Sequence, residues 1–353
     1  MIAASHGQTM PDGSPLFECE VSELLRDGAD SPSVVSTSWF DTPAFATLYR
    51  RPYATRAICW REGALIHASC FTEEKGPFGM RVLRFGGWSR SSGELFDVLD
   101  EKKASAASVG PLYEAQLGPF RNAGQNVTIE VSSNDVVVEL PRTSRDYLAS
   151  LGSQTRKHLP YYLRRLEREF PGRWGQKVLW DSDIRDPQFR MLLELSRRRV
   201  AARGETHGWN EEMIERRQRL IRQHGLLHAI CIDDKFAAGT CSTLYGQEAF
   251  LLLIGHDQQY DKLSIGGLAL WQTINLLIEK GIRRYHLLWG DPFYKRQFGG
   301  VNALLYTVTM YANAPSAALH RLASSAGTVR NFAGRGWRWT ARRLFQRGRG
   351  KHN

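Results

Sequence analysis

The chain is short of cysteine and has no long apolar run. Five cysteines occur among 353 residues, an odd number without CxxC spacing. Disulfide scaffolds of secreted proteins carry denser, paired cysteines, so this pattern favours a reducing compartment. No run of about 18 apolar residues occurs, and the N-terminus lacks the basic and apolar regions of a signal peptide. We therefore expect a cytoplasmic chain that does not span a membrane.

Motifs for covalent and metal-dependent catalysis are also missing. The sequence has no HxxxD, no GxSxG and no cysteine–histidine pair with nucleophilic spacing. No CxxC pair accompanies the ten histidines, so the ligand spacing of a structural zinc site is absent. We expect no bound metal, and a mechanism in which the substrate itself is the nucleophile.

Basic charge is in excess. The formal net charge is +11, and much of it lies between Arg156 and Arg173 and after Arg330. Such a balance indicates an anionic partner: a nucleic acid, a lipid surface, a phosphorylated cofactor or an acidic polymer. In the tail, "GWRWTARRLFQRGRGK" sets aromatic residues among cations, which suits an anionic membrane surface, although a solvated tail fits equally.

The length predicts two domains, because one hydrophobic core usually stops growing below this size. Strand-like and helix-like runs alternate throughout, which indicates a mixed α/β fold. The expected boundaries are a flexible arm at 1–14, an N-terminal lobe at 15–143, a C-terminal lobe at 144–312 and a basic helical or disordered tail at 313–353.

Several local elements can be placed. "NVTIEVSSNDVVVELP" predicts two strands about a Ser-Asn turn, and the helical block from Ser144 should break near Gly152 and again at Pro160. Asn210 is a plausible N-cap. Turns at Asp233-Asp234 and Gly246-Gln247 should separate three strands. A helix at about 267–280, a strand at about 284–288 and a short helix after Asp291 should follow.

The segment "SIGG", Ser264 to Gly267, is the most suggestive motif. It follows the strand-like run "FLLLIG" and opens a helix, so several backbone N–H groups should meet at one point beside the positive end of the helix. Such points bind phosphate. Glycines that only cap a helix give the same pattern.

The continuation resembles a known superfamily. A strand, this loop, a helix, the strand "RYHLLWG" and then "DPFYKRQFGG" resemble the GNAT acyl-CoA transferases. Together with "SxxR…RRLER" in the Arg156 segment, the chain looks like the CelD-type polysaccharide-biosynthesis acetyltransferases, relatives of the Fem peptidyltransferases. The resemblance implies two tandem GNAT-like acyltransferase lobes, each a mixed sheet flanked by helices.

The resemblance also implies a cofactor site and catalytic roles. Acetyl-CoA or another acyl-CoA would place its pyrophosphate on the loop and its pantetheine along the preceding strand, contacting Leu253, Ile254, His256, Leu263, Ser264, Ile265, Gly266 and Gly267. Tyr294 would protonate the departing thiolate, or would only pack the helix onto the sheet. Asp291 is a candidate base or a helix N-cap. Lys295 would pair with a cofactor phosphate, or be solvated.

Four further residues are candidates on the acceptor side. Glu205 and His207, in the loop "RGETHGW", are second candidates for the base, because a near-neutral histidine can accept a proton from an ammonium group. Ser153 and Arg156 match a recurring Ser-x-x-Arg and would bind substrate. The sequence departs from the usual Arg/Gln-x-x-Gly-x-Gly/Ala signature at Leu263 and Leu268, and from the family's Ser-Pro-Gly at Ile265.

These observations lead to one function and two alternatives. We expect an acyl-CoA-dependent N-acyltransferase acting on an amino group of a sugar or sugar nucleotide in polysaccharide or envelope synthesis. The tail would place it at the inner face of a membrane. One alternative is a degenerate GNAT scaffold that binds an anionic polymer without catalysis. The other is aminoacyl transfer from tRNA, as in the Fem relatives, although their long helical hairpin is not evident.

Overall fold

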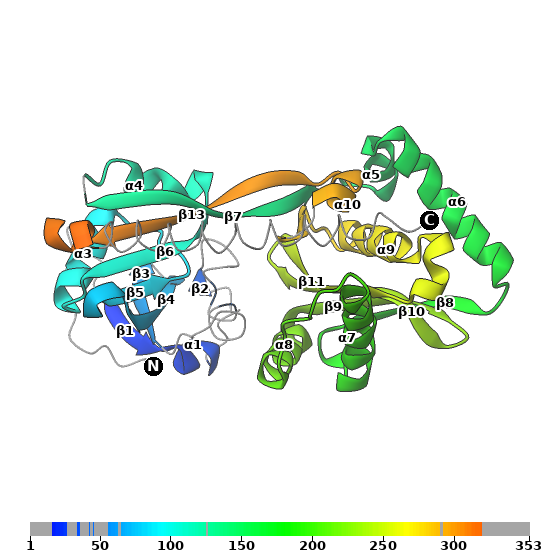
Figure 1. Ribbon diagram of the computed structural model, residues 1–353, viewed down its shortest axis with the longest axis horizontal. Coiled ribbons are helices and arrows are strands. Elements are labelled where there is room, and N and C mark those ends of the chain that lie inside the picture. Colours follow the sequence, from blue (N-terminus) through cyan, green and yellow to red (C-terminus); the bar gives the residue numbers. More distant parts are fainter. Residues whose placement is uncertain are drawn as a thin grey trace, which may run out of the picture.

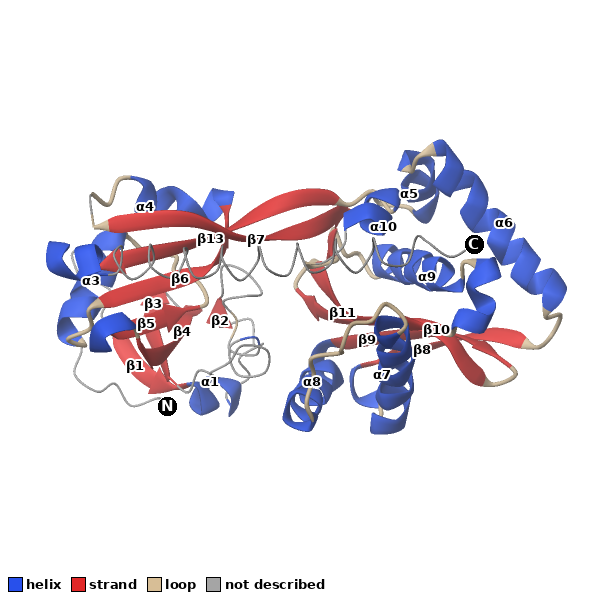
Figure 2. Ribbon diagram, in the orientation of Figure 1, coloured by secondary structure: helices blue, strands red, loops and turns tan. Residues whose placement is uncertain are grey.

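A computed structural model describes residues 16–26, 34–35, 42, 45, 56–62, 65–124, 126–289 and 292–319. The predicted arm, and the predicted tail from residue 320 onward, lie outside the described residues. Two α/β lobes stand side by side, joined by a pair of long strands (Figures 1 and 2). This is the predicted mixed α/β class.

The N-terminal lobe is built mainly on a sheet. Its strands are β1 (Phe17–Glu20), β2 (Val34–Val35), β3 (Arg56–Glu62), β4 (Leu65–Lys75), β5 (Arg81–Phe85) and β6 (Ala106–Tyr113). Its helices are α1 (Val21–Arg26), α3 (Ser92–Glu101) and α4 (Gly118–Arg121), with 3-10 turns η2 (Pro77–Gly79) and η3 (Glu114–Leu117).

The C-terminal lobe is richer in helix. Its helices are α5 (Ser144–Ser150), α6 (Ser153–Glu169), α7 (Asp186–Ala201), α8 (Glu211–His224), α9 (Ile265–Glu279) and α10 (Pro292–Gln297), with 3-10 turns η4 (Asp181–Asp183) and η5 (Gln258–Leu263). Its strands are β8 (Trp174–Trp180), β9 (Gly225–Ile232), β10 (Lys235–Tyr245), β11 (Glu248–His256) and β12 (Arg284–His286). The predicted turns at Asp233-Asp234 and Gly246-Gln247 are confirmed. So is the N-cap, since the Asn210 side chain accepts from the Met213 amide at 3.0 Å.

The two lobes repeat one arrangement. In the first, β3, β4 and β5 are antiparallel, α3 follows, and β6 returns parallel to β5. In the second, β9, β10 and β11 are antiparallel, α9 follows, and β12 returns parallel to β11. Helix α9 is therefore the counterpart of α3, and a comparison of their N-termini can show which lobe is able to bind an anion.

The strands β7 (Val127–Glu139) and β13 (Val301–Tyr311) join the lobes into one sheet, as Figure 1 shows. They pair with each other, while β7 also pairs with β12 and β13 with β6. The predicted turn within β7 was wrong: Ser133 and Asn134 face Leu305 and Leu304, so the ladder continues through them. Residues 305–311 of the predicted C-terminal range thus complete the N-terminal sheet.

The predicted break at Gly152 is confirmed, but the break at Pro160 was wrong. Pro160 lies inside α6, which continues to Glu169. A proline costs one helical hydrogen bond. Leu159 and Leu166, on either side of it, are buried in the main core of the lobe, and this packing holds the helix together. Tertiary contacts therefore override the local signal.

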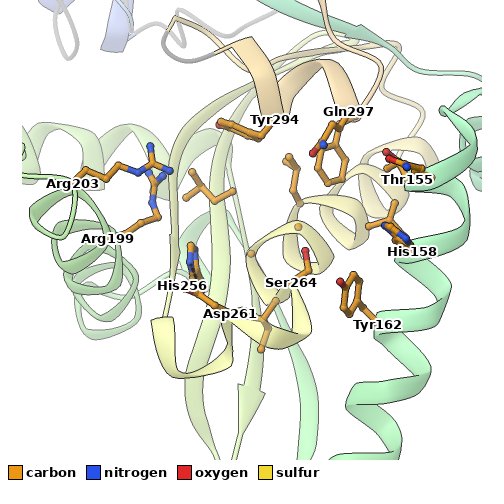
Figure 3. Close-up of a pocket in the computed structure, with 18 residues that line it drawn as sticks. Thr155, His158, Tyr162, Arg199, Arg203, His256, Asp261, Ser264, Tyr294 and Gln297 are labelled. Atoms are coloured by element: carbon orange, nitrogen blue, oxygen red, sulfur yellow. Dashed lines mark ion pairs between the residues drawn. The ribbon is translucent and has the colours of Figure 1, made fainter. Parts of the chain in front are cut away.

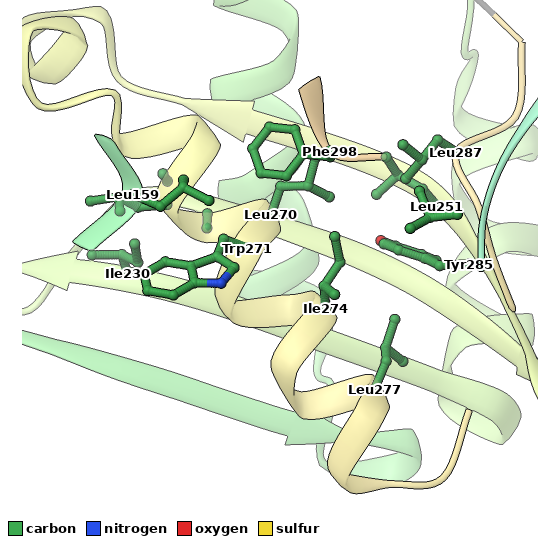
Figure 4. Packing of buried hydrophobic residues seen from close by; sticks show 14 of the residues in the cluster. Leu159, Ile230, Leu251, Leu270, Trp271, Ile274, Leu277, Tyr285, Leu287 and Phe298 are labelled. Atoms are coloured by element: carbon green, nitrogen blue, oxygen red, sulfur yellow. The ribbon is translucent and has the colours of Figure 1, made fainter. Parts of the chain in front are cut away.

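Helix α9 is apolar on almost every face. Its buried residues include Ile265, Leu268, Leu270, Trp271, Ile274 and Leu277. Figure 4 shows them packed against Leu159 of α6 on one side and against strand residues such as Leu251 and Tyr285 on the other. Each such side chain contributes about 1.5–3 kcal/mol when fully buried, so the position of α9 is strongly fixed.

A glycine lets α7 approach β11 closely. A Cβ at Gly255 would lie 2.7 Å from the Ser196 amide nitrogen and 2.9 Å from the Leu192 carbonyl oxygen, both backbone atoms of α7. Such atoms cannot rotate away. Gly255 therefore sets the distance between the helix and the strand that, as shown below, carry the walls of the site.

We predict that Gly255→Ala lowers the free energy of unfolding of the C-terminal lobe by about 1–3 kcal/mol, because the added methyl overpacks this contact. Urea denaturation measures the change. Gly175→Ala in β8 is the matched control, since a Cβ there meets nothing within 4 Å. Equal stability of the two variants would contradict the close contact.

Candidate functional site

The N-terminus of α9 is an open hydrogen-bonding end. Ser264 has a left-handed backbone (φ 49°, ψ 39°), and its side chain makes no capping bond. Its carbonyl accepts from the Leu268 amide at 3.0 Å. The backbone N–H groups of residues 265–267 donate to no backbone carbonyl within the described part of the chain. The positive end of the helix therefore points outward with donors to spare.

This end opens on a cavity of about 450 Å³. That volume suits a small-molecule ligand. Figure 3 shows Arg199 and Arg203 on one side of the cavity and Thr155, His158 and Tyr162 of α6 on the other, with Ser264 between them and Tyr294 above. Of the predicted cofactor residues, the lining includes Ile254, His256, Ser264, Ile265, Gly266 and Gly267.

The counterpart helix in the N-terminal lobe is closed. The Ser91 side chain accepts from the Glu94 amide at 3.3 Å, and the Glu94 carboxylate accepts from the Ser91 amide at 2.9 Å. This capping box places a buried carboxylate at the N-terminus of α3. That carboxylate also pairs with Arg90, so the amides and the charge at this helix end are already engaged. Of the two equivalent helix ends, only that of α9 can receive an anion.

His256 shapes the open end. Its Nε2 lies 3.0 Å from Asp261 Oδ1, and its ring would touch a Cβ on Gly266, with Nδ1 only 2.9 Å away. Burial lowers the pKa of His256, while Asp261 acts in the opposite direction. A side chain at position 266 would therefore collide with this ring unless His256 moved.

Two arginines that sequence reasoning missed face the cavity. Arg199 lies in the last turn of α7 and Arg203 just beyond it, and both line the pocket. Burial lowers the pKa of the Arg199 guanidinium, and Arg203 lowers it further. The signal in the sequence was two arginines four residues apart at the end of an amphipathic helix, but their direction depends on the packing of α7.

A second cavity, of about 390 Å³, lies next to the first. Arg199, Arg203, Ile254 and Tyr294 line both cavities. The predicted base candidates Glu205 and His207 and the strand residue Leu253 line the second one. The structure therefore brings Tyr294 and the Glu205–His207 loop to neighbouring cavities with a common wall.

The surroundings of His207 disfavour its charged form. It lies edge-on to Trp209, with ring centroids 4.9 Å apart, and its Nδ1 is buried without a partner in the described part of the chain. Burial lowers its pKa, and Arg197, Arg217 and Arg199 add to that effect. A histidine that is neutral at pH 7 is able to accept a proton.

The role predicted for Lys295 needs correction. Its ammonium group is buried and donates to the carbonyl oxygens of residues 287, 288 and 289 at 2.8, 2.7 and 2.8 Å. All three of its protons are used inside the fold. Lys295 therefore holds the segment after β12, which lines the second cavity, instead of being offered to a cofactor phosphate.

The other candidates are placed as follows. Leu263 is buried in the core and does not line the cavity, so a ligand has no access to its side chain. Arg156 donates to the Ala149 carbonyl at 2.9 Å and joins α5 to α6, lining neither cavity. Ser153 borders a shallow hollow beside Gln297. Asp291 lies outside the described residues.

One face of α6 was also missed. Thr155, His158, Leu159 and Tyr162 follow helical spacing on that face and line the first cavity. The spacing of these four residues was visible in the sequence, but the many charged residues of the segment predicted only a solvated face.

Known proteins resemble this chain at two levels. A family model described as "Acetyltransferase (GNAT) domain" matches residues 153–296. No curated protein matches the sequence significantly. The matched segment includes every residue that lines the second cavity and all of those that line the first except Gln297 and Phe298.

Solved structures extend the likeness to the fold of most of the chain. The crystal structure of FemX has a TM-score of 0.63 at 9% identity, over 83% of this chain and 96% of FemX. A conserved protein of unknown function from Bacteroides thetaiotaomicron VPI-5482 has a TM-score of 0.55 at 12% identity, over 84% and 99%. Identities this low show the fold alone.

Two further findings concern membrane-spanning helices and metal ions. No helix among the described residues is long and apolar enough to cross a bilayer. Within the same residues, no group of three or more histidine, cysteine, aspartate or glutamate side chains is placed to hold a metal ion.

We predict that Lys295→Met lowers the free energy of unfolding by at least about 2 kcal/mol, because three carbonyl oxygens lose their common donor. Chemical denaturation measures this, and Lys262→Met, at an exposed lysine, should stay within about 0.5 kcal/mol of the wild type. A variant of full stability with weakened cofactor binding would instead restore the phosphate role.

Proposed function

We propose that the chain is an acyl-CoA-dependent N-acyltransferase that works from its C-terminal lobe, with acetyl-CoA as donor. The observation that carries the proposal is the uncapped N-terminus of α9 opening on a ligand-sized cavity within the GNAT domain. A diphosphate would accept from the amides of residues 265–267. The acyl group would lie near Ile254 and Tyr294, where the two cavities meet.

The transfer step follows from this placement. An amine in the second cavity attacks the thioester carbonyl, so that a C–N bond forms and the C–S bond breaks. The phenol of Tyr294 gives its proton to the departing thiolate. The proton released from the amine passes to His207, whose neutral ring stands in the same cavity. Orientation of the two substrates side by side lowers the barrier further.

For the acceptor we propose an amino group on a sugar or sugar nucleotide. Trp209 and Trp289 line the second cavity and offer flat apolar surfaces that suit a sugar ring. The sequence resemblance to the CelD-type enzymes points to polysaccharide or envelope synthesis. A cytoplasmic position beside the membrane, with the basic tail on anionic lipid, belongs to the same proposal.

Aminoacyl transfer from tRNA is the second candidate. It is favoured by the likeness to FemX, which spans most of the chain. Both donors present an activated acyl group, so the two functions differ in what holds the donor: a diphosphate at α9, or a long polyanion. Acetyl-CoA binding separates them.

We predict that acetyl-CoA binds with micromolar affinity and that Tyr294→Phe reduces kcat by roughly 10²–10⁴-fold without weakening that binding, because only the proton donor is lost. Isothermal titration calorimetry and steady-state kinetics with glucosamine measure the two effects. Tyr161→Phe is the matched control, since that tyrosine is 48% exposed and lines neither cavity.

Absence of acetyl-CoA binding would overturn the acyl-CoA proposal. Charged tRNA that then acted as donor would select the second candidate. A protein that binds neither donor, but binds an anionic polymer in a salt-sensitive manner, would be a scaffold without catalysis.

We also predict a pH signature for His207. Because the pKa of His207 is lowered, the fall in kcat/KM as the ring gains a proton should lie on the acidic side of the ordinary histidine value of about 6.5. His207→Gln should lose this acidic limb and keep only the limb that belongs to the acceptor amine. Measuring kcat/KM from pH 4.5 to 8.5 for both forms tests the assignment, and an unchanged acidic limb in the variant would move the role of base to Glu205.

A further inference from the structure

The wall between the two cavities carries unbalanced positive charge. Two other arginines of α7 have carboxylate partners: Arg190 pairs with Glu211 at 3.0 Å, and Arg198 with Glu194 at 2.9 Å. Arg199 and Arg203 form no ion pair in the described part of the chain, and Arg199 Nε is buried without a hydrogen-bond partner. The negative charge of Glu205 acts to raise the pKa of Arg199, but the two side chains form no ion pair.

This arrangement is costly without a ligand. Two guanidinium groups one helical turn apart repel each other, and partial burial of Arg199 removes water that would screen them. The buried Nε–H also needs an acceptor. An oxyanion between the two side chains would satisfy that donor and neutralise both charges.

The donor has an anion site of its own. Its diphosphate is assigned to the α9 amides, which open on the first cavity only. Arg199, in the last turn of α7, and Arg203, just beyond that helix, lie on the opposite side of His256 from Ser264 in Figure 3, and both also line the second cavity. An anion that enters from the acceptor side therefore reaches them without displacing the donor.

The rest of the second cavity suits the body of such an acceptor. Trp289 is 44% exposed, and the guanidinium of Arg217 lies over Trp209, 4.3 Å from the centre of its ring. Flat apolar surfaces beside two cations match a sugar ring that bears a charged group. A phosphate dianion balances two guanidinium groups, and each can grip it with two parallel hydrogen bonds.

Building on the proposed function, we infer that Arg199 and Arg203 recognise a phosphate on the acceptor, so that the natural acceptor is an amino sugar that carries a phosphate or a nucleoside diphosphate. The amine would then lie toward Tyr294 and His207, and the phosphate toward α7. The two arginines act as specificity residues for the acceptor and take no part in the chemical step.

The test compares acceptors that differ only in charge. We expect glucosamine 1-phosphate or UDP-glucosamine to have a KM at least tenfold below that of glucosamine. Arg199→Gln and Arg203→Gln should each raise the KM of the phosphorylated acceptor about tenfold more than the KM of glucosamine, without a comparable rise in the dissociation constant of acetyl-CoA. Arg198→Gln is the matched control, because its side chain is paired on the surface.

Three results would overturn the inference. The first is equal KM values for charged and neutral acceptors in the wild type. The second is a rise in the acetyl-CoA dissociation constant in the arginine variants, which would give the pair to the donor. The third is a preference for a carboxylate-bearing amino sugar such as glucosaminuronate over both phosphorylated ones. If Arg199→Gln folds poorly, Arg199→Lys takes its place: it keeps the charge and should retain part of the preference for the phosphorylated acceptor.

Failure of the proposed function can be told apart from failure of this inference. Calorimetry with glucosamine 1-phosphate reports acceptor binding without turnover. Arginine-dependent binding of this sugar phosphate, in a protein that does not bind acetyl-CoA, would keep the anion site and remove the acyl-CoA proposal. Binding of acetyl-CoA with no arginine-dependent binding of the sugar phosphate would do the reverse.

Discussion

The site depends on the burial of one helix. Helix α9 is enclosed by apolar contacts on nearly all sides, so it can be placed in only one way between α6 and the sheet. Its N-terminus then has to face the single direction that the core leaves open. Because Ser264 turns left-handed and does not cap it, the unpaired amides are presented by a rigid element. A binding end fixed in this way needs little ordering when a ligand arrives.

The two lobes show how one architecture can keep or lose an anion site. They share the order of three antiparallel strands, a helix and a parallel strand. At α3 the helix end is closed by the capping box of Ser91 and Glu94, whereas at α9 it is left open onto the first cavity. A few side chains at a helix N-terminus therefore decide whether a lobe of this fold can bind an anion there. Strand β7 pairs with β12 and in this way supports the segment that carries Trp289.

Local signals in the sequence were sufficient for part of this structure. The loop–helix unit at 264–279, the tight turns of the β-meander and the cap at Asn210 all depend on neighbouring residues, and these were predictable. The continuous β7, the helix through Pro160 and the buried Lys295 depend on partners far along the chain, so propensity pointed elsewhere. Arg199 and Arg203 were missed for the same reason: a sequence shows that arginines are present, but only packing shows which of them lack a counter-ion.

The pairing of β13 with β6 and β7 affects the order in which the chain folds. The partner of β6 in the middle of the sheet is β13, which is nearly the last described element to be synthesised. Until β13 has been synthesised, β6 and β7 each have an edge with unpaired backbone N–H and C=O groups, which can pair with the wrong strand. The first lobe is thus completed last although it is translated first, and its maturation is timed by the appearance of residues 301–311.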